Sequence, residues 1–521
     1  MRRISIWLAG VFFLLVAGLA VLQSFCSPLG LYDEGFALTN ALRILMGDVP
    51  HLHYWAAYPP GTSIVLSVFF TMFGPSIVVA RWVNLLWSLL LLTSFFTVAR
   101  FYGSFFLSSV VTALASLWLA VAIYPSYSGL PALALAFFSI AIFIYALKHD
   151  FFPGIVVAGL SFGIIILFRH DFSGYMLLSC CIAFIFTKQL VQSNRSERDL
   201  SRFGVVILLL FFTALISFSV LLSVVGWHDF YLQALVFPAT GMRQNRLLPV
   251  PGLFDFFVSW KVLWGLAWIV PIFSVIGLLN LHFQRCKLSA MDCLVAVVLA
   301  SMSLFLSVQS HNRLDMAHAA PSMLFLLCLL TVLASRHGEG VQDRIMPWSM
   351  LFAFFLYSTF TVSPFVRFGY ATQCIRTSYS LGECIGPQKM QSDVVDFINK
   401  NFSKSEYVFV GNTRHDSIFT NDASLYFLIK RPIPVKWNEM HPGIVNTLAV
   451  QQKIVRSLET SRVRVVVLAD MPVSKEDNLS SKSTGVYLLD NYIKENFRPV
   501  FANKKYIVLL RADVVAGLPK S

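Results

Sequence analysis

Hydrophobic residues in this chain gather in long runs that are separated by short polar segments. A helix needs about 20 apolar residues to cross the hydrocarbon core of a membrane. Eleven runs come near this length: residues 4–25, 76–99, 105–123, 130–147, 153–168, 172–188, 203–225, 260–281, 290–308, 317–334 and 346–363. The pattern therefore predicts a polytopic α-helical membrane protein with about 11 transmembrane helices.

The first run follows Met1-Arg2-Arg3 and stays apolar to about Leu22. Its charged start resembles that of a signal peptide, but the apolar part is long and no convincing small-residue cleavage site follows it. We expect a retained first helix that acts as a signal anchor.

Basic residues fall in alternate connections between the predicted helices. If the N-terminus is cytoplasmic, every inner loop carries Lys or Arg, as the positive-inside rule requires. These residues are Arg100; Lys148; Lys188, Arg195, Arg198 and Arg202; Arg285 and Lys287; and Arg336 and Arg344. The formal net charge of +13 is thus explained by membrane orientation, and the sequence carries no nucleic-acid motif. An odd number of helices places the segment after the last helix outside.

The composition changes sharply after the last apolar run. We expect a transmembrane module over residues 1–363 and a soluble α/β domain over residues 364–521. Short apolar runs predict strands at 407–410, 463–468 and 506–510, and helices near 388–400, 444–459 and 485–496. Cys374 and Cys384 both lie in this outer part, so a periplasmic location makes them candidates for a disulfide.

The first outer loop, residues 27–75, is long for a connection between packed helices. Apolar spacing over residues 34–46 predicts a short helix that lies in the membrane interface. A second apolar stretch, residues 62–73, is too short to span the membrane and is also predicted to be an interfacial helix.

Acidic and basic side chains gather in four outer loops. Ionisable groups near the membrane are costly and usually belong to a site, although loops are also polar for no special reason. The set comprises Asp33 and Glu34 in the first outer loop; Arg169, His170 and Asp171 in the third; Arg243 and Arg246 in the fourth; and His311, Arg313, Asp315 and His318 in the fifth. The spacing of the last group does not match a structural zinc site, so we predict no metal there.

Several short motifs occur in a definite order. Asp33-Glu34-Gly35 follows the first helix, and Gly47-Asp48-Val49-Pro50, Tyr58-Pro59-Pro60-Gly61, Phe73-Gly74 and Arg81 follow in turn. With Leu167 to Asp171 and Gln309 to His318, this plan resembles the GT-C glycosyltransferases, among them protein O-mannosyltransferases and the lipid A aminoarabinose transferase. The resemblance covers most of residues 1–363, and it is strongest to the bacterial members of the group.

The resemblance implies a reaction and a membrane. A sugar would move from a polyprenyl-phosphate carrier to a glycan, lipid or protein acceptor at the outer face, with inversion at the anomeric carbon. The location implied is the bacterial inner membrane. Some members of the group use a divalent cation and others do not, so this cofactor stays open.

The resemblance also implies roles for the polar residues. Asp33 is the predicted catalytic base, with Glu34 second; a helix cap with a favourable dipole contact is the alternative for both. For the remaining residues, local salt bridges and headgroup contacts are the alternatives. Predicted substrate-binding residues are His53, Tyr58, Arg81, Arg169, His170, Asp171, Arg243, Arg246, Arg313, Asp315 and His318.

Three other functions fit a protein of this composition. A transporter or flippase of a lipid-linked sugar is the main alternative, but we find no internal repeat of the kind that transporters often carry. An O-antigen ligase or polymerase would concentrate its polar residues in a later loop. A membrane scaffold would have no need for acids gathered on one face.

Overall fold

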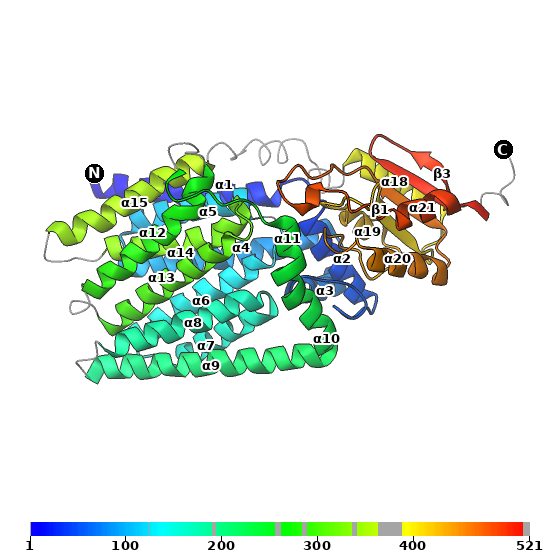
Figure 1. Cartoon of the computed structure of the whole chain (residues 1–521). Coiled ribbons are helices and arrows are strands. Elements are labelled where there is room, and N and C mark those ends of the chain that lie inside the picture. Colours follow the sequence, from blue (N-terminus) through cyan, green and yellow to red (C-terminus); the bar gives the residue numbers. More distant parts are fainter. Residues whose placement is uncertain are drawn as a thin grey trace.

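The computed structural model of the chain describes residues 2–123, 125–189, 194–255, 262–283, 289–335, 341–362 and 388–513. A bundle of long helices forms one part of the molecule, and a smaller domain with a sheet lies beside one end of it (Figure 1). Cys374 and Cys384 fall outside the described residues.

The bundle contains the predicted transmembrane helices. Ten of the described helices are long and apolar enough to cross a membrane, and residues Phe152–Leu167 form a shorter apolar element. The bundle helices are α1 (Arg2–Phe25), α4 (Ile77–Tyr102), α5 (Phe105–Ala122), α6 (Gly129–Lys148), α7 (Phe152–Ile164) with η1 (Ile165–Leu167), α8 (His170–Lys188), α9 (Asn194–Val225), α12 (Val262–Phe283), α13 (Ala290–Ser310), α14 (Met316–Ala334) and α15 (Val341–Val362).

Helix α9 begins nine residues before the predicted start at residue 203. Its first turns carry charged residues, so they do not belong to an apolar run. Arg and Glu are nevertheless good helix formers. Two of these side chains are also held: Asp150 lies 3.5 Å from Arg198 and pairs with Arg202 as well. The start of α9, which carries Arg198 and Arg202, lies at the end of the bundle farthest from the C-terminal domain (Figure 1).

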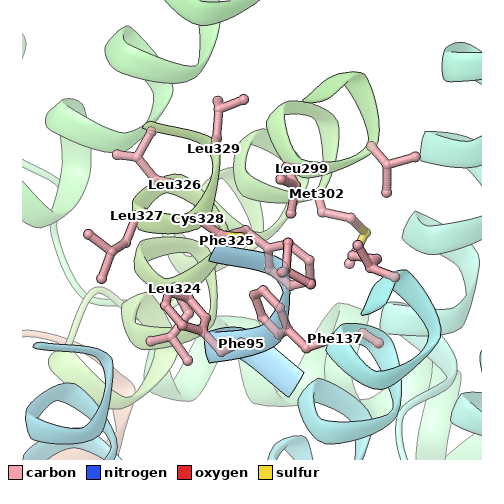
Figure 2. Close-up of a cluster of buried hydrophobic side chains, with 14 of the residues drawn as sticks. Phe95, Phe137, Leu299, Met302, Leu324, Phe325, Leu326, Leu327, Cys328 and Leu329 are labelled. Carbon is pink, nitrogen blue, oxygen red and sulfur yellow. The ribbon is translucent and has the colours of Figure 1, made fainter. Parts of the chain in front are cut away.

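Side chains from α4, α6, α13 and α14 fill the centre of the bundle (Figure 2). The ring of Phe137 stacks on Phe325 with centroids 4.8 Å apart and lies 5.3 Å from Phe95. Helix α14 is buried along most of its length, whereas α1 and α9 expose many large apolar side chains. Such an apolar outer surface suits contact with lipid.

Both predicted helices of the first outer loop are present, as α2 (Asp33–Leu45) and α3 (Gly61–Phe73). Helix α3 exposes Ile64, Val68 and Met72 along one face, as expected of a helix in the membrane interface. Helix α2 differs from the prediction, because residues 34–43 are all buried between the bundle and the C-terminal domain.

Residues 227–246 were predicted to belong to a long loop, but they are helical. Helix α10 (Trp227–Phe230), the π-helical turns η2 (Tyr231–Val236) and η3 (Pro238–Met242), and α11 (Arg243–Arg246) follow one another. Pro238 lacks a backbone N–H, which disfavours regular α-helical hydrogen bonding at this point. The segment leads from the end of α9 to the side of the C-terminal domain (Figure 1).

The C-terminal part is an α/β domain, as predicted. Its four strands are ordered β1-β2-β4-β3: β1 (Val408–Asn412) is parallel to β2 (Val465–Ala469), and β4 (Tyr506–Arg511) is antiparallel to both β2 and β3 (Phe497–Ala502). The helices are α18 (Lys389–Asn401), α19 (Ser424–Ile429), α20 (Leu448–Thr460) and α21 (Leu488–Asn496). Strand β3 and helix α19 were not predicted.

Candidate active site

Asp33 is the first residue of α2, at the end of the bundle that faces the C-terminal domain. The residue is exposed, and no described residue donates a hydrogen bond to its carboxylate. The protein that surrounds it nevertheless reduces its hydration, which raises the pKa of the Asp33 carboxyl above its usual range. Arg246 opposes this shift most strongly among the neighbouring charges. Asp33 is thus an unpaired carboxylate beside a cation.

Glu34 has the opposite environment. It forms a bidentate ion pair with Arg81, with Nε–Oε1 at 2.7 Å and Nη2–Oε2 at 2.8 Å, and both side chains are fully buried. Arg81 also donates to the carbonyl of Ser24 at 2.8 Å and to the hydroxyl of Ser27 at 2.7 Å. The pair therefore joins the first outer loop to the end of α1. This geometry gives no support to the predicted catalytic role of Glu34 or to the predicted substrate contact of Arg81.

Arg246, at the end of α11, is a buried guanidinium with an exposed fraction of 9%. It donates to the carbonyl of Phe419 at 2.8 Å and lies over the rings of Phe419 and Tyr32, at 4.8 and 5.4 Å. Its Nε has no hydrogen-bond partner among the described residues, and no carboxylate of that part forms an ion pair with it. An incompletely satisfied, buried cation of this kind is suited to an anionic ligand.

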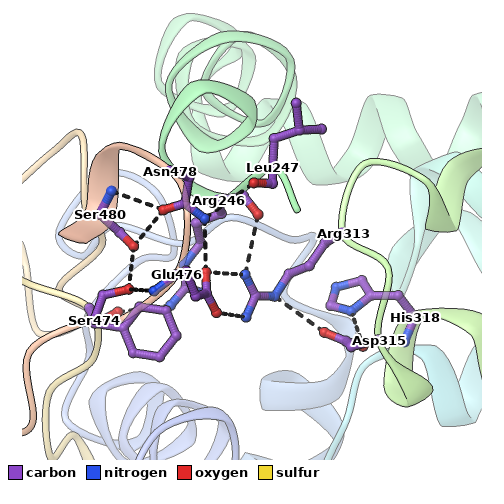
Figure 3. A network of polar contacts seen from close by, with 10 residues as sticks. Arg246, Leu247, Arg313, Asp315, His318, Ser474, Glu476, Asn478 and Ser480 are labelled. Atoms are coloured by element: carbon purple, nitrogen blue, oxygen red, sulfur yellow. Dashed lines mark hydrogen bonds and ion pairs between the residues drawn. The ribbon is translucent and has the colours of Figure 1, made fainter. Parts of the chain in front are cut away.

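Arg313 lies nearby, but its side chain is already paired (Figure 3). It forms a bidentate bridge to Glu476 of the C-terminal domain, at 3.0 and 2.7 Å, and its Nε lies 3.2 Å from Asp315. Asp315 caps α14 by accepting from the backbone N–H of His318 at 3.0 Å, and its carboxylate also lies 2.7 Å from Nδ1 of that ring. The charges of Arg313, Asp315 and His318 act on Asp33, so the fifth outer loop approaches the first.

The third outer loop contributes a second ion pair, which is partly buried. Arg169 binds Asp171 through Nε at 2.9 Å and Nη2 at 2.5 Å, and it donates to the hydroxyl of Tyr127 at 3.0 Å. Its guanidinium lies 4.8 Å from the ring centroid of Tyr58. Gln309 donates to Asp171 from the end of α13. The local salt bridge that was the alternative to substrate binding is therefore present. Tyr58 lies close enough to Arg169 and Asp33 for the charges of both to affect its hydroxyl.

Two close backbone contacts explain glycines of the predicted motifs. A Cβ on Gly61 would lie 2.4 Å from the carbonyl oxygen of Leu167, so this residue lets the start of α3 approach η1, beside the third loop. A Cβ on Gly35 would lie 2.5 Å from the backbone nitrogen of Ser424. Gly35 therefore allows α2 to lie directly against α19 of the C-terminal domain.

The remaining predicted residues lie at the margin of this arrangement. His53 is about half exposed and stays within its own loop, where Nδ1 accepts from the backbone N–H of Val49 at 2.9 Å. Arg243 is exposed. His170 begins α8, and its buried Nδ1 has no partner among the described residues. In the described part of the chain, no hydrogen bond or ion pair joins any of these three residues to Asp33.

The C-terminal domain supplies polar residues that were not predicted. Nδ1 of His441 lies 2.9 Å from the hydroxyl of Tyr32, and its Nε2 lies 3.0 Å from Glu439. Glu439 lies close enough to Asp33 for the two charges to interact. These residues are about 400 positions from the first loop, so no local pattern could link them to it; the only signal was the polar run Asn438-Glu439-Met440-His441.

Backbone and side-chain contacts fix the C-terminal domain on α2. Ser424 donates its backbone N–H to the carbonyl of Leu31 at 3.1 Å, and Thr39 donates to the carbonyl of Ala423 at 2.8 Å. Arg43 donates to the carbonyl of Val435 at 2.8 Å. The described residues contain no group of three or more His, Cys, Asp or Glu side chains arranged to hold a metal ion.

The fold is similar to those of two solved structures. One is ArnT from Cupriavidus metallidurans bound to undecaprenyl phosphate, at 14% identity and a TM-score of 0.55, over 98% of this chain and 99% of that one. The other is the Archaeoglobus fulgidus oligosaccharyltransferase in the apo form, at 12% identity and a TM-score of 0.52, over 88% of this chain and 69% of that one. No protein-family model and no curated protein sequence matches the chain. The chain therefore shares the fold of these two structures, in agreement with the fold that the resemblance to the GT-C glycosyltransferases implies.

Proposed function

We propose that the protein is an inverting glycosyltransferase that moves a sugar from a polyprenyl-phosphate carrier to an acceptor hydroxyl at the outer face of the membrane. The observation that carries this proposal is the unpaired carboxylate of Asp33 beside the unpaired cation of Arg246. Most other charges in the region neutralise one another, as in the pairs Glu34–Arg81 and Arg169–Asp171.

The two unpaired groups match the two charge changes of such a reaction. The acceptor oxygen attacks the anomeric carbon while the bond from that carbon to the carrier phosphate breaks. Asp33 takes the hydroxyl proton as the new bond forms, because a raised pKa makes a carboxylate a stronger base. Arg246 holds the negative charge that remains on the carrier phosphate, since a guanidinium can bind two phosphate oxygens. Direct displacement from the opposite face inverts the configuration.

The fold supports a lipid carrier of this kind. The solved ArnT of similar fold holds undecaprenyl phosphate. The exposed apolar face of α3 and the exposed side of α9 offer surface to a membrane next to the site. The carrier would reach Asp33 from the lipid while the acceptor approaches from water, on the side of the C-terminal domain.

The proposal includes an orientation and a location. The N-terminus lies in the cytoplasm and the C-terminal domain lies in the periplasm of a bacterial inner membrane. The support is the distribution of Lys and Arg over alternate connections of the sequence; in the described part, the end of α4 with Arg100 and the start of α9 with Arg198 lie at the end of the bundle opposite α2.

Mass spectrometry of surface glycans, glycolipids and glycoproteins tests the function and identifies the product. Cells with the wild-type protein, a deletion and Asp33→Asn are compared, with Asp470→Asn as a control because Asp470 is an exposed acid at the end of β2. We expect one sugar to be absent from the deletion and from Asp33→Asn, and present in the control. No change in the deletion would contradict the proposal and favour a transporter or flippase of a lipid-linked sugar.

A further inference from the structure

Three side chains form a buried hydrogen-bonded chain between the first outer loop and the C-terminal domain. The Tyr32 hydroxyl lies 2.9 Å from Nδ1 of His441, and Nε2 of the same ring lies 3.0 Å from Oε1 of Glu439. His441 and Glu439 have exposed fractions of only 3% and 5%. A buried His–carboxylate pair that reaches toward a site can orient the group at its other end.

Aromatic rings pack around the His441 ring of this hydrogen-bonded chain. The centroid of the His441 ring lies 4.9 Å from that of Trp55 and 5.9 Å from those of Phe36 and Phe237. Burial, with a smaller contribution from Arg246, lowers the pKa of His441 well below its usual range, while burial and Asp33 raise that of Glu439. A neutral imidazole donates with one nitrogen and accepts with the other, so it can bridge the other two groups.

Tyr32 connects this chain to both groups of the proposed reaction. It immediately precedes Asp33, and it is the N-cap residue of α2. Its ring also lies under the guanidinium of Arg246, whose carbon is 5.4 Å from the ring centroid. A shift of Tyr32 would therefore move the carboxylate and the cation relative to each other.

We propose that Glu439 and His441 of the C-terminal domain are positioning residues for the transferase site, which act by holding Tyr32 and, through it, Asp33 and Arg246. This inference rests on the proposed function. It gives the C-terminal domain a part in arranging the site at the membrane.

The docking of the domain supports a fixed position for this chain. Asn438, next to Glu439, donates to the side-chain oxygen of Asn40 on α2 at 3.0 Å and accepts from Arg43 at 3.1 Å. Trp55, which packs on His441, donates its backbone N–H to the carbonyl of Lys436 at 2.9 Å. The segment that carries Glu439 and His441 is thus held on α2 and on the first loop at several points.

The test measures transfer rates in washed membranes that retain the cell's own donor and acceptor, with the protein level matched between variants. Tyr32→Phe and His441→Ala should each lower the rate by about tenfold, roughly the effect of losing one buried hydrogen bond. His441→Asn, whose side-chain amide lies near the position of Nδ1, should recover part of the loss. Tyr426→Phe is the matched control, since among the described residues the hydroxyl of Tyr426 bonds only the backbone of Val410, which lies in the same domain.

A purely structural role would produce a different pattern. The melting temperature would then fall in parallel with the rate, and the control would behave like Tyr32→Phe. A wild-type rate in Tyr32→Phe and His441→Ala, together with a lost rate in Asp33→Asn, would overturn the positioning role and leave the proposed function intact. An unchanged rate in Asp33→Asn would instead contradict the proposed function.

Discussion

Glu34 and Arg81 form a fully buried bidentate ion pair, at 2.7 and 2.8 Å, whereas Asp33, the residue before Glu34, is exposed and has no hydrogen-bond partner among the described residues. Two adjacent acids therefore have separate tasks. One joins the first outer loop to α1 and α4, and the other is available for chemistry.

This division predicts a large loss of stability on substitution of Glu34 and little change on substitution of Asp33. Glu34→Gln leaves the buried charge of Arg81 uncompensated, which should lower the free energy of unfolding by about 3–5 kcal/mol. Asp33→Asn should change it little, because the Asp33 carboxylate makes no bond within the described structure. Thermal unfolding of the protein in detergent measures both variants. A similar loss of stability in the two would contradict separate tasks.

The two central arginines should differ in their effect on carrier binding. Arg246 lacks a carboxylate partner among the described residues, while Arg313 is paired with Glu476 and Asp315. Arg246→Ala should therefore weaken the binding of undecaprenyl phosphate more than Arg313→Ala does. Titration of the purified variants with undecaprenyl phosphate measures this difference. The reverse order would place the phosphate at the fifth outer loop.

The transfer rate should fall as the pH is lowered, and the fall should begin at a higher pH than the pKa of an ordinary aspartate implies. A base works when it is deprotonated, and the surrounding protein, by reducing the hydration of Asp33, raises the pKa of its carboxyl above the usual value of about 3.9. The charged groups that act on it are Arg246, His318, Asp315, Arg313 and Glu439. Rate measurements across pH locate the acid limb.

Asp315→Asn tests this interpretation by the direction in which the acid limb of the rate shifts. The negative charge of Asp315 raises the pKa of Asp33, so its removal should move the acid limb to lower pH. Asn remains a good N-cap, which preserves the start of α14. A shift to higher pH would mean that another group controls the limb.

The contact between α2 and α19 should depend on Gly35. A Cβ there would lie 2.5 Å from the backbone nitrogen of Ser424, so Gly35→Ala should separate the C-terminal domain from α2. Limited proteolysis should then release the domain faster. Gly174→Ala is the matched control, because a Cβ on this helical glycine meets nothing within 4 Å. Equal cleavage of both variants would contradict the close packing.

Membrane orientation can be tested by labelling from outside the cell with an impermeant thiol reagent. Arg243 and Arg198 lie at opposite ends of the bundle and both are exposed. In a background without the native cysteines, Arg243→Cys should be labelled and Arg198→Cys should be protected. Labelling of only the second variant would invert the proposed topology.

The sequence was informative where structure depends on local patterns. Runs of bilayer length identified the long helices, and apolar spacing identified α2 and α3 within the first loop. Strand β3 could not be found in this way, because most of its side chains are exposed. Helix α19 has only six residues, which is too short for a periodic pattern.

Which loops approach one another at the candidate site could be predicted from the sequence, but most of the ion pairs there could not. The distribution of Lys and Arg along the sequence predicted that the first, fourth and fifth outer loops lie on the same side of the membrane. Charged residues of the fourth and fifth loops act on Asp33 of the first, which agrees with this prediction. Nothing in the sequence could show that Arg81 pairs with Glu34, or that Arg313 pairs with Glu476 across 163 positions. Such partners depend on how the helices and the C-terminal domain pack in three dimensions.

The most direct test of the central claim is the transfer rate of Asp33→Asn, once the product is known. The amide keeps the size of the side chain but cannot take a proton, so the rate should fall by at least about a hundredfold, the usual contribution of a general base. The melting temperature should stay at the wild-type value. A wild-type rate in this variant would contradict the assignment of Asp33 as the catalytic base.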